Sequence, residues 1–285
     1  MYYEYIEKEL SIYYQQIKNS KIKEIIKYSL DGGKCIRGFI VKHLIETLTN
    51  KPCKIWQPIV AIELIQGVSL VIDDLPCMDN DLIRRNKPST FAQYGERQAI
   101  LTSLYGISEA FNILFQGLKI LKEDINFNIN SDIYINMIEN ILINWNEFIG
   151  KNLIVGQMLD LKENIENLIN INIPINNINI VIYKTCSLFI FSFILGGIYS
   201  NKSINLEEYK LMGYYFGVMF QIMDDSNDID SDIIESNIVL SQGKSSASLL
   251  YLESKSKLLD LLKNNNLVTI ELMNLINIID NMLKL

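Results

Sequence analysis

The chain has 285 residues, of which 49% are hydrophobic and 21% are charged. This composition provides a sizeable buried core and excludes an intrinsically disordered chain. A net charge of -7 and a pI near 4.9 exclude a broad nucleic-acid surface, which needs clustered Lys and Arg. Because the four cysteines contain no CxxC pair, we expect reduced thiols in a cytoplasmic protein.

The helical period dominates the sequence. Met1–Leu10 mixes Tyr with Glu and Lys and lacks the apolar core of a signal peptide. From Ile59 to Ile72, apolar residues recur at spacings of three and four, as in an α-helix. Turn-forming residues interrupt this pattern at 31–33, 50–52, 86–88, 126–130, 174 and 201–203. Without a linker or a fixed-period repeat, the sequence predicts a single all-α domain over residues 1–285.

Two later segments need separate interpretation. The most apolar run, Leu188–Tyr199, is shorter than the roughly 20 residues that cross a bilayer, so we predict a buried helix and no transmembrane segment. The Ile/Asn-rich stretch Ile169–Ile180 alternates briefly, but Pro174 interrupts it. Because Asn is a poor strand former, we interpret this stretch as a loop or helix junction.

The first acidic cluster follows the predicted helix that ends near Asp73. It contains Asp73, Asp74, Asp79 and Asp81. Pro76 is expected to end the regular helix, which lets Asp79 fold back toward Asp73. Such carboxylates repel unless a cation neutralises them, and Mg²⁺ usually takes one or two carboxylates plus phosphate oxygens. The alternative is a solvated acidic helix end.

The second acidic cluster also follows apolar helix. Asp224 and Asp225 lie four and three residues before Asp228, so their carboxylates share one helical face. Carboxylates on one face cost stability unless they are bridged. Two such clusters in one chain therefore suggest a bimetallic or trimetallic diphosphate site.

Basic residues complement these clusters. Arg84-Arg85 follows the first cluster, and a Gly-Gly pair precedes Lys34 and Arg37. Arginine matches diphosphate oxygens bidentately, whereas lysine acts as a point charge. The alternative for the arginines is local pairing with Asp79 and Asp81. The Gly-Gly-Lys element alone fits an ordinary turn and is not a Walker loop.

Seven motifs occur in order along most of the chain. They are GGKxxR from Gly32, DDLPCMDND from Asp73 followed by RR, YGE from Tyr94, GQMLDL from Gly156, KT at Lys184, FQIMDDSND from Phe220 and GKS from Gly243. In this order they resemble the all-trans isoprenyl (polyprenyl) diphosphate synthase family, particularly short-chain farnesyl and geranylgeranyl diphosphate synthases of bacterial and plant type. Any single motif is weak evidence, whereas the ordered combination is specific.

The resemblance implies a fold, a reaction and an assembly. The fold would be a single-domain isoprenoid-synthase helical bundle whose two Asp helices face across a deep central cavity. The reaction would condense isopentenyl diphosphate with dimethylallyl, geranyl or farnesyl diphosphate, giving farnesyl or geranylgeranyl diphosphate. The chain would work as a homodimer, with a heteromer as the open alternative.

The resemblance also assigns roles to individual residues. The metal ligands would hold up to three Mg²⁺ ions, with Asp73, Asp79 and Asp224 leading and Asp74 and Asp228 supporting. The allylic diphosphate would bind to Arg84 and Lys184, and isopentenyl diphosphate to Lys34, Arg37 and Arg85, with Lys244 as a weaker assignment. The allylic cation would be stabilised by Gln157, Gln221 and the carbonyl of Thr185.

Several positions depart from the family pattern. Cys35 replaces a basic residue, Gln66 replaces a histidine that contacts isopentenyl diphosphate, and Leu104 replaces an aspartate. The loop between Asp228 and Gly243 is short and lacks a lysine. Each lost charge-assisted contact costs about 1.5 to 3 kcal/mol, which favours a slower enzyme over an inactive one.

Two other functions stay open. A non-catalytic partner subunit would keep the fold and help to set product length in a heteromer. A terpene cyclase would share the ionisation chemistry without needing a site for isopentenyl diphosphate. The retained Lys34, Arg37 and Arg85 disfavour the cyclase.

Product length depends, in the family, on side chains about one turn before the first cluster. Val68 and Ser69 occupy these positions. Neither is the aromatic residue of many farnesyl synthases, which favours a twenty-carbon product. Short bacterial-type relatives commonly make the fifteen-carbon product, so the sequence leaves both open.

Overall fold

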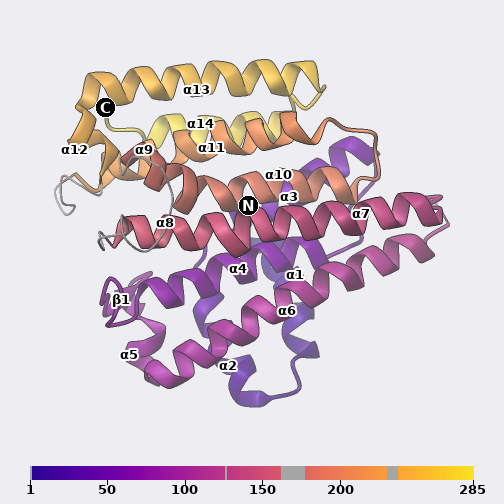
Figure 1. Ribbon diagram of the computed structural model, residues 1–285, viewed down its shortest axis with the longest axis horizontal. Helices are drawn as coiled ribbons and strands as arrows, with labels where there is room; N and C mark the ends of the chain where they lie inside the picture. Colours follow the sequence, from indigo (N-terminus) through magenta and orange to yellow (C-terminus); the bar gives the residue numbers. More distant parts are fainter. Residues whose placement is uncertain (1, 126, 162–176, 230–236) are drawn as a thin grey trace. The chain divides into compact units, whose positions relative to one another are not determined.

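The computed structural model describes residues 2–125, 127–161, 177–229 and 237–285 (Figure 1). Its contacts divide the chain into two compact units. Unit 1 comprises Met1–Glu46 and Asn50–Ile138, and unit 2 comprises Thr47–Thr49 and Glu139–Leu285. Each unit is described on its own.

Unit 1 is built around helix α4, Gln57–Asp73. The surrounding elements are α1 (Tyr2–Gln16), α2 (Ser20–Leu30), α3 (Ile36–Thr49), β1 (Ile83–Arg84), β2 (Lys87–Pro88), α5 (Thr90–Tyr94), α6 (Glu96–Glu123) and the first part of α7 (Ser131–Asn144). α4 packs against α1, α2 and α6. It is apolar around most of its circumference, as expected of a helix surrounded by others.

Two glycines let the helices of unit 1 approach closely. A Cβ atom at Gly67 would lie 2.2 Å from Cδ2 of Leu30, and one at Gly106 would lie 2.5 Å from Cγ1 of Val68. Both distances are far below van der Waals contact. α2 and α6 therefore fit against α4 only because these positions carry no side chain.

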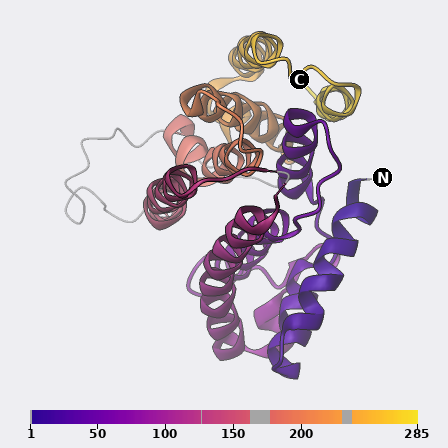
Figure 2. The same ribbon diagram turned by 90° about the vertical axis from the view of Figure 1, so that its right-hand side faces the viewer.

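Unit 2 is a stack of helices around α11, Leu206–Asn227. The others are η1 (Trp145–Asn152), α8 (Leu153–Asp160), α9 (Asn177–Ile180), η3 (Val181–Cys186), α10 (Ser187–Tyr199), α12 (Ile238–Gln242), α13 (Lys244–Asn264) and α14 (Ile270–Met282). η1 and η3 are π-helical. α10, α11, α13 and α14 run alongside one another (Figure 1), and Figure 2 shows α13 and α14 end-on.

The predicted all-α class is confirmed, with one local exception. The breaks at 31–33, 50–52 and 201–203 fall between helices, and 126–130 lies between α6 and α7. At 86–88 the structure instead has an antiparallel hairpin, in which Ile83 pairs with Pro88 and Arg84 with Lys87. The turn residues Arg85 and Asn86 have positive φ angles of 53° and 60°, as a tight two-residue hairpin turn requires.

The predicted junction at Ile169–Ile180 lies mostly outside the described residues. Pro174 belongs to that part, whereas α9 begins at Asn177. The end of this stretch is therefore helical, and the loop or helix junction stays a prediction for the rest of it.

The apolar run near Tyr199 is longer than the sequence indicated. η3 continues into α10, and together Val181–Tyr199 are long and apolar enough to cross a membrane. The prediction that length excludes a membrane span is therefore wrong. The prediction of burial is confirmed, because every residue of α10 is buried within the protein.

Candidate active site

The first acidic cluster begins at the end of α4. Asp73 is the last residue of the helix. The chain then turns at Pro76, and the backbone N–H of Asp79 donates to the carbonyl of Asp73 at 2.9 Å. Asp73 is half-buried and Asp79 is exposed. The predicted return of Asp79 toward Asp73 is thus confirmed for the backbone.

Asp74 differs from its neighbours because it is only 1% exposed. Its Oδ1 accepts hydrogen bonds from Nε and Nη2 of Arg84 at 2.8 and 2.5 Å. Nη2 also donates to Asp81 at 2.9 Å. Burial raises the pKa of Asp74, and the hydrogen bond and charge of Arg84 oppose that rise. Local pairing of Arg84 therefore occurs, with Asp74 and Asp81.

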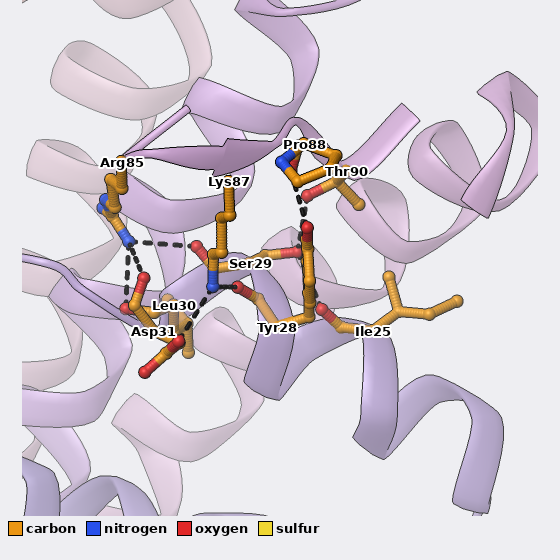
Figure 3. A network of polar contacts seen from close by, with 9 residues as sticks. All are labelled: Ile25, Tyr28, Ser29, Leu30, Asp31, Arg85, Lys87, Pro88 and Thr90. Carbon is orange, nitrogen blue, oxygen red and sulfur yellow. Dashed lines mark hydrogen bonds and ion pairs between the residues drawn. The ribbon is translucent and has the colours of Figure 1, made fainter. Parts of the chain in front are cut away.

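Arg85 and Lys87 bind the end of α2 (Figure 3). Nη1 of Arg85 donates to the carbonyls of Ser29, Leu30 and Asp31 at 3.1, 2.9 and 3.1 Å. Nζ of Lys87 donates to the Asp31 carboxylate at 2.9 Å. The last carbonyls of a helix lack partners within it, so the hairpin caps α2. One nitrogen of Arg85, a predicted diphosphate ligand, thus has a structural role.

The loop with Lys34 and Arg37 connects α2 to α3. Lys34 is exposed and Arg37 is half-buried. Cys35, which replaces a basic residue, is buried and has a positive φ of 51°. Burial raises the pKa of its thiol. The departure at Cys35 therefore places a neutral, buried side chain at the start of α3.

Sequence reasoning missed Glu63, which lies in the middle of α4. It is 6% exposed, and its Oε1 accepts from the backbone N–H of Gly38 at 2.6 Å. One signal was available, because Glu63 is the only charged residue between Pro58 and Ile72. Gln66 follows one turn later, and its buried Oε1 has no hydrogen-bond partner within the part of the chain that the structure describes.

The second acidic cluster lies at the end of α11 in unit 2. Asp224 is half-buried and Asp228 is exposed, whereas Asp225 is 4% exposed. The Asp225 carboxylate accepts from Nε2 of Gln221 at 2.6 Å and from the backbone N–H of Ile238 at 2.7 Å. Asp225 therefore holds the start of α12.

Two further predicted residues, Lys184 and Thr185, lie in η3, which packs against α11. Thr185 donates to Oε1 of Gln221 at 2.5 Å. Nζ of Lys184 donates to Asp160 at 2.6 Å. A Cβ atom at Gly156 would lie 2.3 Å from the backbone nitrogen of Lys184, so only glycine lets α8 approach η3.

Gln157 follows that glycine, and both polar atoms of its amide are buried without a hydrogen-bond partner among the described residues. Lys244 lies apart from these contacts, as the exposed first residue of α13. Leu104, where the family has an aspartate, is 60% exposed on α6. The segment 230–236 of the short loop lies outside the described residues.

Comparison with known proteins identifies the chain. The Polyprenyl synthetase family pattern matches residues 19–271. The chain belongs to this family. It is 31% identical over 249 residues to farnesyl diphosphate synthase of Micrococcus luteus, covering 85% of this chain and 79% of that protein. The chain is therefore a prenyltransferase, and the predicted family and enzyme class are confirmed.

Two other proteins extend this comparison. Chloroplastic geranylgeranyl pyrophosphate synthase of Capsicum annuum is 28% identical, over 73% of this polyprenyl synthetase and 53% of that protein. The crystal structure of a geranyltranstransferase from Thermotoga maritima has a TM-score of 0.75 at 26% identity, covering 98% of this chain and 97% of that chain. The helical fold predicted from the motifs is confirmed.

Polyprenyl synthetases generally act with Mg²⁺. Within the described residues, no group of three or more His, Cys, Asp or Glu side chains is arranged to hold a metal. Mg²⁺ usually needs only one or two carboxylates, because substrate phosphates supply other oxygens. Asp73 and Asp79, and likewise Asp224 and Asp228, provide such oxygen donors. The donor set therefore fits Mg²⁺ that binds together with a diphosphate.

Proposed function

We propose that the chain is a short-chain all-trans prenyl diphosphate synthase. It condenses isopentenyl diphosphate with dimethylallyl and geranyl diphosphates to give farnesyl diphosphate, or also with farnesyl diphosphate to give geranylgeranyl diphosphate. One observation carries this proposal. The hairpin after the first acidic cluster pairs with that cluster through Arg84 and, through Arg85, with the end of α2, which leads into the loop of Lys34.

That connection supports a site for isopentenyl diphosphate. Lys34, Arg37 and Arg85 would bind its diphosphate, with Gln66 beside them and Lys244 as a weaker contributor. A terpene cyclase has no use for such a site. Nη1 of Arg85 already donates to α2 carbonyls, so we assign the diphosphate contact to the rest of its guanidinium group.

Ionisation of the allylic substrate is assigned to both acidic clusters and two cations. Arg84 and Lys184 would bind the leaving diphosphate, which has to replace or share their present partners Asp74, Asp81 and Asp160. Mg²⁺ held by Asp73, Asp79 and Asp224, with Asp74 and Asp228 in support, would neutralise charge on that diphosphate when bound. Fixed charges of this kind act without reorganisation during the reaction.

The remaining chemistry follows the ionised bond. The C–O bond to diphosphate breaks, and the isopentenyl double bond supplies the electron pair for the new C–C bond. Gln157, Gln221 and the carbonyl of Thr185 would stabilise the cation without attacking it. The released diphosphate takes the final proton. The buried, unpartnered amide of Gln157 supports its assignment, because a buried polar group without a partner is costly.

Product length is proposed to depend on α4. Val68 is 1% exposed and packs at Gly106 of α6, and Ser69 donates to the carbonyl of Gln66. Neither side chain is an aromatic floor. We retain both farnesyl and geranylgeranyl diphosphate as products, and we further propose a homodimer in which residues 1–285 act as a single domain.

The test is an assay of the purified chain with isopentenyl diphosphate, dimethylallyl diphosphate and Mg²⁺, with products identified by chromatography. Elongation to fifteen or twenty carbons is expected. Cyclised hydrocarbon without consumption of isopentenyl diphosphate would indicate a cyclase. Absence of turnover by the homomer under every condition would contradict the proposal and favour a partner subunit.

A further inference from the structure

The buried carboxylate of Glu63 has no part in the chemistry assigned above. It lies in the middle of α4 and is 6% exposed. A carboxylate at such a position is strongly disfavoured unless hydrogen bonds and opposite charges offset its desolvation. The contacts of Glu63 therefore indicate what its presence achieves.

The hydrogen bond of Glu63 goes to the start of α3. Gly38, whose N–H donates to Oε1 at 2.6 Å, is the third residue of that helix. Cys35, directly before the helix, provides no side-chain cap. The first N–H groups of a helix need acceptors from outside it, and a negative charge there is favourable. Glu63 thus supplies from α4 the cap that Cys35 does not.

Gly38 leaves the space that this contact needs. A Cβ atom there would lie 3.0 Å from Cγ and 3.2 Å from Oε1 of Glu63. Even alanine would therefore press on the carboxylate. The glycine and the glutamate form one contact between α3 and α4.

Two arginines assigned to isopentenyl diphosphate also interact with this carboxylate. Burial is the largest influence on Glu63 and raises its pKa, while the charges of Arg37 and Arg85 oppose the rise. Burial lowers the pKa of Arg85, and Glu63 is the first of the charges that oppose it. One buried carboxylate therefore provides an attractive charge to both guanidinium groups.

Helix α4 aligns this contact with the first acidic cluster. Asp74 follows Glu63 by eleven residues, close to three turns, so both carboxylates lie on one side of the helix. Asp74 holds Arg84 at 2.8 Å. Gln66 lies one turn after Glu63. The same side of α4 therefore carries an anchor for each half of the proposed substrate site in unit 1.

Building on the proposed synthase function, we propose that Glu63 is a positioning residue for isopentenyl diphosphate. Through its hydrogen bond with Gly38 it fixes the start of α3, and with it Lys34 and Arg37, and it provides a negative charge for Arg37 and Arg85. Glu63 does not touch the substrate and acts through Lys34, Arg37 and Arg85.

The test compares the steady-state kinetics of Glu63→Leu and Glu63→Gln for each substrate. Leucine removes the acceptor at similar size, so KM for isopentenyl diphosphate should rise about tenfold or more. KM for geranyl diphosphate should change less than about twofold. Glutamine keeps a carbonyl acceptor for Gly38 and should restore most of the loss.

The matched control is Ile65→Ala. Ile65 is 1% exposed and lies on the opposite side of α4 from Glu63. This change should lower the melting temperature, but the ratio of KM for isopentenyl diphosphate to KM for geranyl diphosphate should stay as in the wild type. If Glu63→Leu instead raises both KM values equally, or neither, its role is only structural and the inference is overturned.

Gly38→Ala provides an independent test that does not require Glu63→Leu to fold. It should raise KM for isopentenyl diphosphate selectively, and it should add little in a Glu63→Ala background, because the displaced side chain is gone. Fully additive effects would overturn the inference. Lack of turnover by the wild type would count against the synthase itself, and calorimetric titration with isopentenyl diphosphate would then give the same comparison of variants.

Discussion

The two units hold acidic clusters that are built alike around different partners. In each Asp-Asp pair the second residue is buried, Asp74 in unit 1 and Asp225 in unit 2, while the first is half-buried. Asp74 binds a cation, Arg84. Asp225 accepts hydrogen bonds from two neutral donors, Nε2 of Gln221 and the backbone N–H of Ile238. We therefore propose that the first aspartate of each pair binds metal, whereas the second stabilises the local fold.

The two cations that we assign to the allylic diphosphate, Arg84 and Lys184, have carboxylate partners in different places. Arg84 takes its carboxylate partners from within the acidic cluster, whereas Lys184 pairs with Asp160 outside the second cluster. A diphosphate that binds Arg84, as we propose, would therefore compete with carboxylates of the first cluster, and one that binds Lys184 would compete with Asp160.

The largest expected effect is on catalytic activity, which should depend on the first aspartate of each Asp-Asp pair. Asp73→Asn and Asp224→Asn should each lower kcat on the order of a thousandfold, because a charged carboxylate that we propose as a ligand of Mg²⁺ becomes a neutral amide. The free energy of unfolding should stay nearly constant. Steady-state kinetics over a Mg²⁺ titration, together with urea unfolding, measures both. A variant that loses activity only in parallel with stability would contradict the division.

The free energy of unfolding should depend more on the second aspartate of each pair than on the first. Asp225→Ala leaves the buried donors of Gln221 and Ile238 without an acceptor, and should lower the free energy of unfolding by about 2 to 4 kcal/mol. Asp74→Ala should cost less, about 1 to 2 kcal/mol, because Arg84 is partly exposed and retains Asp81. Urea unfolding measures both, with Asp224→Ala as the control. Equal losses of unfolding free energy for Asp224→Ala and Asp225→Ala would contradict the structural role that we assign to Asp225.

The sequence predicts the parts of this arrangement that local chemistry determines. Helical periodicity indicated α4, Pro76 indicated the end of its regular helix, and the return of Asp79 followed from that end. The order of motifs identified the family. These features depend on residues that are close in the chain, so periodicity and the missing N–H of proline suffice to find them.

Tertiary contacts explain what the sequence did not reveal. The hairpin at Arg85 is stabilised by α2 carbonyls far away in the chain, which no local pattern displays. The difference between Asp224 and Asp225 depends on Ile238, and the cap on α3 comes from Glu63 of another helix. Side chains that act through distant backbone groups have no spacing signature.

Product length tests unit 1 separately from unit 2, because we assign the residues that control it to unit 1 alone. Val68→Phe adds an aromatic ring about one turn before Asp73, at a residue that is already 1% exposed. The product should become shorter if this side chain lines the path of the growing tail. Chromatography of the products measures the change. An unchanged product distribution in a folded, active variant would show that Val68 does not line that path.

The smallest expected effect concerns pH and the carboxylate of Glu63. Burial raises the folded-state pKa of Glu63 above its unfolded value, so the native state binds the proton more tightly. Its contribution to stability is therefore full below the unfolded pKa, about 4.3, and is lost as pH rises through the raised folded pKa. Relative to Glu63→Gln, which does not titrate, the wild type should lose stability over that window. Unfolding midpoints measured in urea between mild acid and neutral pH give this difference. A difference that stays constant with pH would show that the hydrogen bond from Gly38 and the charges of Arg37 and Arg85 offset burial fully.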